Sequence, residues 1–186
     1  MLHVLAFSGS LRSISINTTL LRAATRLAPA GLSIRVYDGL GRLPLFNPDD
    51  EHDPPAPVRA LWSAVEAADA FLIASPEYAH GVTGAMKNAL DWLVGFGPFA
   101  YKEVAVLNAS MRAHHADAAL KETLRTMSAY LVDEACVRIP GLAAGMDADA
   151  IVASPASADV LRAAIFALRD AVNARRRSPD TIQPQR

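Results

Sequence analysis

The chain has 186 residues, of which 52% are hydrophobic and 20% charged, with a net charge of −1 and one cysteine. This length fits one domain that buries a substantial core without disulfides. The near-zero charge gives no general attraction to nucleic acid or acidic lipid, and a single cysteine excludes an intramolecular disulfide and any metal site built from several cysteines.

The first residues, Met1 to Phe7, lack the basic segment, the long apolar segment and the cleavage site of a signal peptide. No apolar run approaches the roughly 20 residues that a membrane-spanning helix needs. We therefore expect a cytoplasmic protein.

Short apolar runs alternate with segments of helical periodicity along the chain. The runs predict buried strands at residues 3–8, 32–37, 70–74, 103–108 and 134–139. The periodic segments predict helices at residues 16–27, 58–68, 83–94, 116–131 and 160–172. Residues 38–57 form a long connection rich in glycine and proline, and connections of that length are more often functional than idle.

The alternation of apolar strands with helices indicates a parallel sheet that is covered by helices on both faces. Five strands favour the flavodoxin-like order 2-1-3-4-5 over a six-stranded dinucleotide-binding sheet. We therefore predict one α/β domain, a flavodoxin-like three-layer sandwich, over residues 1–174. The polar, proline-bearing residues 175–186 are expected to be a disordered tail.

The segment after the first predicted strand has the features of a phosphate site. Gly9 can turn the chain sharply off the strand. Hydroxyl and amide side chains then stand beside the open N–H groups at the start of the next helix, where a phosphate is stabilised. Arg12 can add a bidentate hydrogen bond. The polar residues concerned are Ser10, Ser13, Ser15, Asn17 and Thr18.

Two familiar nucleotide motifs are absent from this segment. It has no Gly-x-Gly-x-x-Gly fingerprint and no Gly-Lys-Ser/Thr of a Walker loop. One terminal phosphate ester, as on FMN, fits best. The alternative is that Ser15 or Asn17 simply caps the helix and that Arg12 is solvated.

The segment after the third predicted strand is suited to a flat polar ring. Pro76 fixes one torsion and leaves neighbouring backbone groups free for a ligand. A flavin needs N–H donors for its carbonyl oxygens and an acceptor for its own N–H, and a rigid backbone turn supplies both. Tyr78 can lie along the ring, and Gly81 permits close approach. The alternatives are a packing role for Tyr78, a solvated Glu77 and a surface position for His80.

Together the two segments resemble the NAD(P)H-dependent FMN reductase family, which includes chromate-, quinone- and azo-dye-reducing flavoenzymes. The first match is Gly9-Ser10-Leu11-Arg12-Ser13-Ile14-Ser15-Ile16-Asn17. The second runs from Ser75-Pro76-Glu77-Tyr78 to Lys87-Asn88-Ala89-Leu90-Asp91-Trp92. The resemblance covers roughly residues 3–172 and implies a flavodoxin-like fold, bound FMN, and NADPH or NADH as co-substrate.

The same resemblance implies roles for particular residues. The phosphate would be held by Ser10, Arg12, Ser15, Asn17 and Thr18. The ring would be surrounded by Pro76, Glu77, Tyr78, His80 and Gly81. Ser110, after the fourth predicted strand, is a further candidate for cofactor binding.

The family also implies a homodimer or homotetramer with the flavin near the subunit boundary. The predicted helix over residues 83–94 carries an apolar group of Met86, Leu90, Trp92 and Leu93. This group could be the core of one chain, or it could lie in a subunit interface, where tryptophan and methionine are enriched. Because of the resemblance, we favour the interface.

Three positions depart from the family pattern. Ala79 stands where asparagine is frequent, and Thr83 stands where proline is common. Residues 108–115, Asn-Ala-Ser-Met-Arg-Ala-His-His, replace a turn that is often rich in glycine. This segment could narrow the pocket, recognise an anionic acceptor or the nicotinamide phosphate, weaken FMN binding, or simply begin a helix with exposed side chains.

The implied function is an oxidoreductase that passes hydride from NADPH or NADH through FMN to a small-molecule acceptor. Quinones, azo compounds, metal oxyanions and free flavin are the acceptors to consider. The chemistry belongs to the cofactor, so we assign no catalytic side chain and no metal ligand. A flavodoxin-type electron carrier, which usually needs an acidic docking face, and a flavin-binding module inactivated by residues 111–115 are the alternatives.

Overall fold

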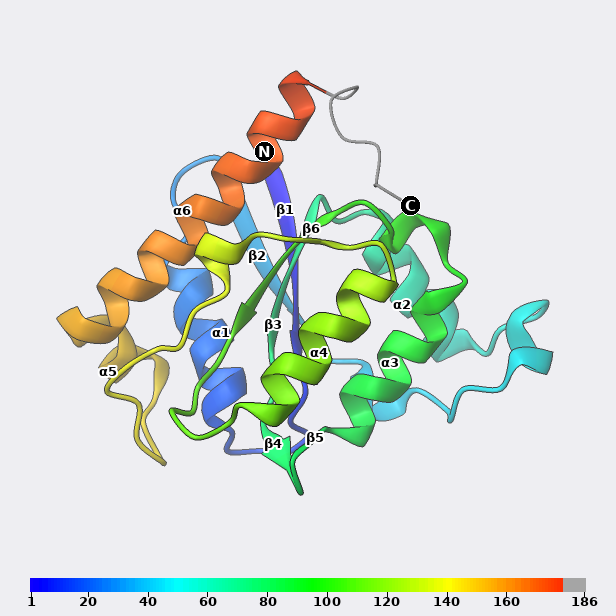
Figure 1. Ribbon diagram of the computed structural model, residues 1–186, viewed down its shortest axis with the longest axis horizontal. Helices are drawn as coiled ribbons and strands as arrows, with labels where there is room; N and C mark the ends of the chain where they lie inside the picture. The colour runs from blue at the N-terminus through cyan, green and yellow to red at the C-terminus, as the bar shows by residue number, and fades with distance from the viewer. Residues whose placement is uncertain (179–186) are drawn as a thin grey trace.

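Five parallel strands in the order β2-β1-β3-β6-β7 form the middle layer of the structure, a computed structural model that describes residues 1–178 (Figure 1). Leu5 of β1 lies opposite Arg35 on one side and Phe71 on the other. Counted in chain order within this sheet, the arrangement is 2-1-3-4-5, which confirms the predicted flavodoxin-like fold. The strands are β1 (Leu2–Ser8), β2 (Leu32–Tyr37), β3 (Ala70–Ala74), β6 (Glu103–Leu107) and β7 (Tyr130–Leu131).

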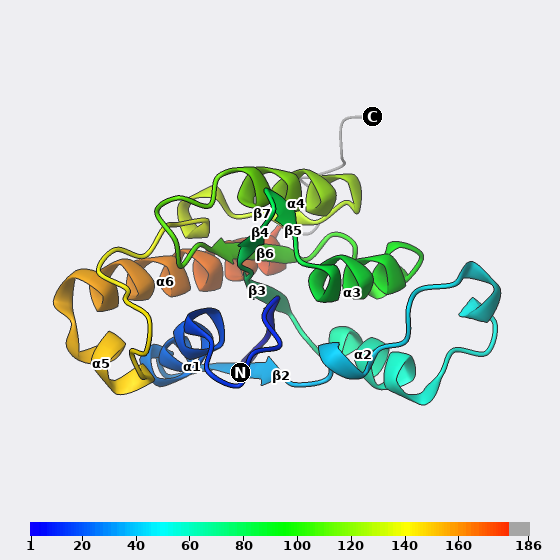
Figure 2. The same cartoon turned by 90° about the horizontal axis from the view of Figure 1, so that it is seen from below.

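Helices cover both faces of the sheet, so the fold has three layers (Figure 2). One face packs against α1 (Ile16–Leu27), α5 (Ala148–Ala153) and α6 (Pro155–Arg177). The other face packs against α2 (Ala56–Glu66), α3 (Gly84–Val94) and α4 (His115–Thr126). Short 3-10 turns occur at η1 (Leu40–Arg42), η2 (Pro48–Glu51), η3 (Gly97–Phe99) and η4 (Asp133–Ala135).

The burial of the strand residues explains why helices cover both faces of the sheet. Every residue of β3 and β6 is buried, as expected for strands that are covered on both faces. Along β1, Val4 and Ala6 join the core under α1, whereas Leu5 and Phe7 join the core under α2 and α3. Alternate side chains of one strand therefore hold the two helical layers to the sheet.

The fifth strand is shorter and earlier than predicted. The sequence pattern indicated a strand at residues 134–139 and a helix as far as residue 131. Instead, α4 ends at Thr126, because Ser128 adopts a left-handed conformation with φ of 61° and turns the chain. The next residues form β7, the chain then leaves the sheet through η4, and Arg138 returns for a single bridge to Asn108. Leu131 continues the helical spacing of α4 in the sequence, but in the structure it belongs to β7.

The last helix is longer than predicted at both ends. It begins at Pro155, whose lack of an N–H is tolerated in the first turn, and it continues to Arg177. Arg175 holds that end by pairing with Glu103 and by lying 3.5 Å from the ring centre of Tyr130. The helix thus continues three residues past residue 174, where the domain was predicted to end. Residues 179–186 of the predicted tail lie outside the described residues.

Two further elements were not predicted. The short helix α5 is capped by Asp147, whose carboxylate accepts a hydrogen bond of 2.8 Å from the backbone N–H of Ala150. The other is a small antiparallel hairpin, β4 (Glu77–Tyr78) and β5 (Gly81–Val82), at the carboxyl end of β3. Among residues 1–178, no helix is both long enough and apolar enough to cross a bilayer.

Candidate functional site

The segments that follow β1, β3 and β6 meet at the carboxyl edge of the sheet, at the lower end of the strands in Figure 1. They line a cleft of about 260 Å³. Ile16 and Asn17 border it from α1, residues 75–77 from the segment after β3, and residues 108–110, 112 and 113 from the segment after β6. The carboxyl edge of a parallel sheet is where folds of this type bind ligands.

The loops after β1 and β3 are joined by direct contacts. The N–H of Gly9 donates to the carbonyl oxygen of Ala74 over 2.9 Å. A Cβ atom on Gly9 would lie 2.1 Å from Oγ of Ser75, so only glycine permits this approach. The hydroxyl of Thr83 donates to the carbonyl oxygen of Gly9 over 2.7 Å and also caps α3. Proline at position 83 could not make this hydrogen bond, so the departure from the family pattern has a structural role.

The loop after β1 carries a series of open hydrogen-bond donors. The backbone N–H groups of residues 11–17 donate to nothing within residues 1–178. Ser15 caps α1 by accepting from the N–H of Thr18, as the alternative interpretation expected. The hydroxyl of Thr18 in turn bonds that of Ser8 over 2.8 Å. Ser15 and Thr18 therefore shape the loop, and the N–H groups are left for a ligand.

Two side chains in this loop also lack partners in the described part of the chain. Oδ1 of Asn17 is buried, with the residue only 5% exposed, and has no hydrogen bond. Buried polar atoms are normally satisfied, so this amide indicates a missing ligand group. The guanidinium of Arg12 makes no ion pair with residues 1–178. Open N–H groups, an unpaired arginine and an unsatisfied amide fit the phosphate and hydroxyl groups of FMN.

The hairpin after β3 has a strained two-residue turn. Ala79 and His80 both adopt left-handed conformations, with φ of 48° and 61°. A turn of this kind matches the twist of the strands but favours glycine or asparagine. Tyr78 is 55% exposed, so it is not a core packing residue. The hairpin thus presents backbone groups and an aromatic ring at the carboxyl edge.

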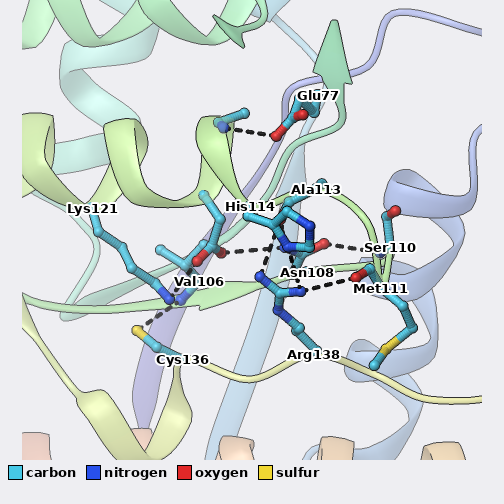
Figure 3. Close-up of polar contacts among 12 residues, drawn as sticks. Glu77, Val106, Asn108, Ser110, Met111, Ala113, His114, Lys121, Cys136 and Arg138 are labelled. Atoms are coloured by element: carbon cyan, nitrogen blue, oxygen red, sulfur yellow. Dashed lines mark hydrogen bonds and ion pairs between the residues drawn. The ribbon is translucent and has the colours of Figure 1, made fainter. Parts of the chain in front are cut away.

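The hairpin is attached to the start of α4 at two points. Oε2 of Glu77 accepts a hydrogen bond of 2.8 Å from the N–H of Ala116 (Figure 3). This bond lowers the pKa of the Glu77 carboxyl, partial burial opposes the shift, and His115 and His80 lower the pKa further. The His80 ring stacks on that of His115, with centroids 4.3 Å apart. The Glu77 carboxylate therefore caps α4 through Oε2.

The segment after β6 is ordered by side chains in place of glycines (Figure 3). The buried amide of Asn108 donates to the carbonyl oxygen of Ala113 over 2.7 Å and accepts from the N–H of Ser110 over 2.9 Å. The guanidinium of Arg138 donates to the carbonyl oxygen of Met111 over 3.0 Å and lies 3.1 Å from Nδ1 of His114. Sequence reasoning missed Arg138, because only the bridge to Asn108 brings it here.

The predicted site residues fall into three groups. Asn17, Pro76, Glu77 and Ser110 border the cleft described above. Ser10, Arg12 and Thr18 border a second cleft on the other side of the same loop. Ser15 lies within the loop, and the remaining three, Tyr78, His80 and Gly81, lie on the hairpin or its turn.

The apolar group on α3 is core, so its interpretation as a subunit interface is wrong. Met86, Leu90, Trp92 and Leu93 are at most 2% exposed within one chain. Trp92 also donates from Nε1 to the carbonyl oxygen of Pro44 over 2.9 Å. The side chain of Asn88 completes this contact by bonding the backbone of Pro44 and Phe46. The helix therefore anchors the long connection between η1 and α2.

The strand order defines a flavodoxin-like α/β protein. Residues 2–143 match the family described as NADPH-dependent FMN reductase, and the chain belongs to that family.

Named relatives agree with this assignment. A probable NADPH:quinone oxidoreductase 2 of Oryza sativa subsp. japonica is 45% identical over 117 residues, covering 59% of this chain and 56% of the relative. An NAD(P)H-dependent FMN reductase of Pseudomonas aeruginosa is 43% identical over 113 residues, covering 59% of this chain and 60% of the relative. The matches thus span less than two thirds of these two relatives.

Longer matches exist as well. A 2-hydroxy-1,4-benzoquinone reductase of a Burkholderia species is 36% identical over 133 residues, covering 70% of this chain and 72% of the relative. Among solved structures, a flavoenzyme NAD(P)H:(acceptor) oxidoreductase from Paracoccus denitrificans superposes with a TM-score of 0.77 and 28% identity, covering 94% of this chain and 98% of that one.

Proposed function

We propose that this protein is an FMN-dependent oxidoreductase that uses NADPH or NADH to reduce quinones. The observation that carries the proposal is the loop after β1, whose open N–H groups and unsatisfied Asn17 amide lie next to the hairpin after β3. Family membership adds FMN as the ligand that fits both segments. Azo compounds, metal oxyanions and free flavin are further acceptors, and the names of the relatives favour quinones.

Different residues hold different parts of the cofactor. The N–H groups of residues 11–17, with Ser10 and Arg12, bind the phosphate. Asn17 and Ser110 face the cleft and bond the hydroxyl-bearing chain of FMN. The backbone of residues 76–81 binds the polar edge of the ring, and Tyr78 covers part of it. When bound, FMN supplies the hydride chemistry, and the protein supplies placement.

We also propose a homodimer or homotetramer, with its contact at the carboxyl edge of the sheet. Leu11, Ile14, Tyr78 and Met111 all follow strands at this edge, and each is more than half exposed. Exposed apolar side chains that gather in one region favour an interface. Light scattering on the purified protein measures the assembly, and a monomer at all concentrations would contradict the proposal. Because the reaction consumes NAD(P)H, we place it in the cytoplasm.

The first experiment loads the protein with FMN, desalts it and records the absorbance spectrum. We expect flavin bands to stay with the protein and to be lost more readily from Arg12→Ala than from Arg125→Ala, a matched surface change on α4. Anaerobic NADPH should then bleach the bands, and added quinone should sustain NADPH oxidation. Retained flavin that supports only a single reduction would instead indicate an electron carrier.

A further inference from the structure

The segment of residues 108–115, after β6, borders the cleft, yet only one of its side chains has a role in the proposed function. That side chain is Ser110. In the same segment this chain departs from the family pattern, since Asn-Ala-Ser-Met-Arg-Ala-His-His replaces a turn that is often rich in glycine. What the segment contributes to the site is therefore particular to this chain.

Arg112 stands at the border of the cleft on a backbone that is held on both sides. Its N–H donates to Oγ of Ser110 over 3.1 Å. The carbonyl oxygen of the next residue, Ala113, accepts from the buried amide of Asn108 over 2.7 Å. Arg112 is exposed, and its guanidinium has no hydrogen bond or ion pair within residues 1–178. A fixed backbone thus presents an unpaired positive charge beside the cleft.

A second positive charge, on Arg138, lies against the same segment (Figure 3). Its guanidinium contacts the carbonyl oxygens of Met111 and Ala113 and Nδ1 of His114, at distances of 3.0 to 3.4 Å. Because an arginine only donates, Nδ1 of His114 accepts, and the hydrogen of this neutral ring lies on Nε2. No carboxylate within residues 1–178 pairs with Arg138, so its charge adds to that of Arg112.

The carboxylates near this segment already have partners. Oε2 of Glu77 accepts a hydrogen bond from the start of α4. Asp117 pairs with Lys121, with 2.8 Å between the charged atoms. The hairpin after β3 and the segment after β6, together with Arg138, therefore carry two guanidinium groups against one carboxylate. This excess of positive charge attracts ligands that carry negative charge.

The segment and the start of α4 lie against the hairpin whose backbone is proposed to bind the polar edge of the flavin ring. The hydrogen bond from Ala116 to Glu77 joins the two, and so does the stacking of His115 on His80, with ring centroids 4.3 Å apart. Arg112 thus stands beside the position proposed for the ring, which an electron acceptor has to approach in order to be reduced.

We propose that Arg112 is a specificity-determining residue that favours quinones with an acidic substituent, a carboxylate or a sulfonate, over neutral quinones. A guanidinium is a planar fork that bonds two oxygens of such a group at once, and charge-assisted hydrogen bonds are about twice as strong as neutral ones. This proposal rests on the proposed function and names a class of acceptor for it.

The test compares two acceptors with the same ring system, 1,4-naphthoquinone-2-sulfonate and the neutral 2-methyl-1,4-naphthoquinone. For each FMN-loaded protein we measure the ratio of kcat/KM for the sulfonate to kcat/KM for the neutral quinone. The two quinones differ in intrinsic reactivity, but this difference is the same for every variant and cancels when the ratios are compared. We expect the ratio to fall about tenfold in Arg112→Ala, because a charge-assisted hydrogen bond is removed. Arg125→Ala, an exposed arginine on α4, is the matched control and should keep the wild-type ratio.

A series of charges at position 112 sharpens the test. Arg112→Lys keeps the positive charge without the fork, so it should retain a ratio between those of the wild type and Arg112→Ala. Arg112→Glu reverses the charge and should give the lowest ratio of the four proteins. Added salt screens exposed charges, so it should lower the ratio more in the wild type than in Arg112→Ala.

Binding is measured separately from turnover. Naphthalene-2-sulfonate carries the anionic group but has no quinone to reduce, and it is titrated into the FMN-loaded protein by calorimetry. We expect its affinity to fall about tenfold in Arg112→Ala and to stay unaltered in Arg125→Ala.

Two results would overturn the proposal. One is an equal acceptor ratio in the wild type and Arg112→Ala, with both proteins loaded with FMN and shown to be folded by circular dichroism. The other is easier loss of FMN from Arg112→Ala than from Arg125→Ala after desalting, since Arg112 would then hold the flavin itself.

Turnover of the neutral quinone separates this proposal from the proposed function. Reduction of both quinones with a ratio that does not depend on Arg112 would overturn the specificity and leave the reductase intact. If neither quinone is reduced, the reductase and with it the selection of quinones are overturned, even where naphthalene-2-sulfonate binds through Arg112.

Discussion

The polar segments after β1 and after β6 are similar in composition and opposite in their hydrogen bonding. After β6, Asn108 and Arg138 satisfy the backbone of residues 110–113 from within the chain. After β1, residues 11–17 leave their N–H groups open, and the buried Asn17 amide has no partner within residues 1–178. A polar loop that supplies its own partners is structural, whereas one that keeps donors open is built for a ligand. The two asparagines should therefore respond to mutation in opposite ways.

Asn108→Ala should have the largest effect on stability. It removes the hydrogen bonds of a buried amide to the N–H of Ser110 and to the carbonyl oxygen of Ala113, which keeps only a longer bond of 3.4 Å from Arg138, and this loss costs about 2–3 kcal/mol. Urea unfolding with FMN absent measures the loss. An Asn108→Ala protein as stable as the wild type would mean that solvent can replace this amide, and the contrast with the loop after β1 would fail.

Thr83→Val tests the joint between the loops after β1 and β3. It removes the hydrogen bond to the Gly9 carbonyl oxygen and the cap of α3, so we expect a loss of about 2 kcal/mol. Thr83→Ser keeps the hydroxyl and should lose less than half as much in the same unfolding experiment. A serine variant that loses as much stability as the valine variant would mean that the methyl group contributes as much as the hydroxyl, and it would contradict this explanation.

Asn17→Ala should weaken FMN binding with little effect on folding. The amide makes no hydrogen bond within the described chain, and alanine favours the first turn of a helix, so stability without FMN should change by less than about 0.5 kcal/mol. The affinity for FMN should fall about tenfold, or about 1.4 kcal/mol. Fluorescence titration of FMN into the apoprotein checks this, and unaltered affinity would remove Asn17 from the site.

Ala79→Gly should stabilise the hairpin that lies between the two segments. The wild-type alanine has φ of 48°, a conformation that costs a side-chain-bearing residue about 1 kcal/mol and glycine much less. We expect a gain of about 0.5 kcal/mol after the greater chain entropy of glycine is subtracted. Thermal unfolding at neutral pH measures it. A loss of stability would show that this alanine is not strained.

Glu77→Gln tests the attachment of the hairpin to α4 through its dependence on pH. The folded-state pKa of Glu77 is lowered, chiefly by the hydrogen bond from the Ala116 N–H, so the carboxylate stabilises the fold above its ordinary value of 4.5. That contribution is lost as the pH falls through the lowered folded-state pKa. The wild type should thus exceed the variant slightly at neutral pH and match it in acid. A difference that stays constant between these limits would contradict this explanation.

The sequence predicted the parts of the molecule that depend on local patterns. The apolar runs identified four strands closely, and their alternation with helices led to the correct sheet order. The open N–H donors after β1 could be predicted because they are consecutive in the chain. The site residues themselves stay predictions, since no ligand contact tests them.

What escaped prediction depends on contacts between distant residues. The left-handed Ser128 ended α4 early, although Leu131 continued the helical spacing. The sequence alone does not tell whether Trp92 lies in the core or in a subunit interface. In the folded chain the long connection brings Pro44 to Trp92, and this contact places Trp92 in the core. Only the tertiary fold brings Arg138 to residues 111–114, so no local sequence pattern predicts these contacts.

The brevity of β7 has a consequence for how copies of this chain can associate. A long exposed edge strand is a template on which another chain can add its own strand. At this border of the sheet the template is only the two residues Tyr130–Leu131, and the Arg175 guanidinium lies over the Tyr130 ring. Continuous sheets that run from one molecule to the next through this border are therefore disfavoured.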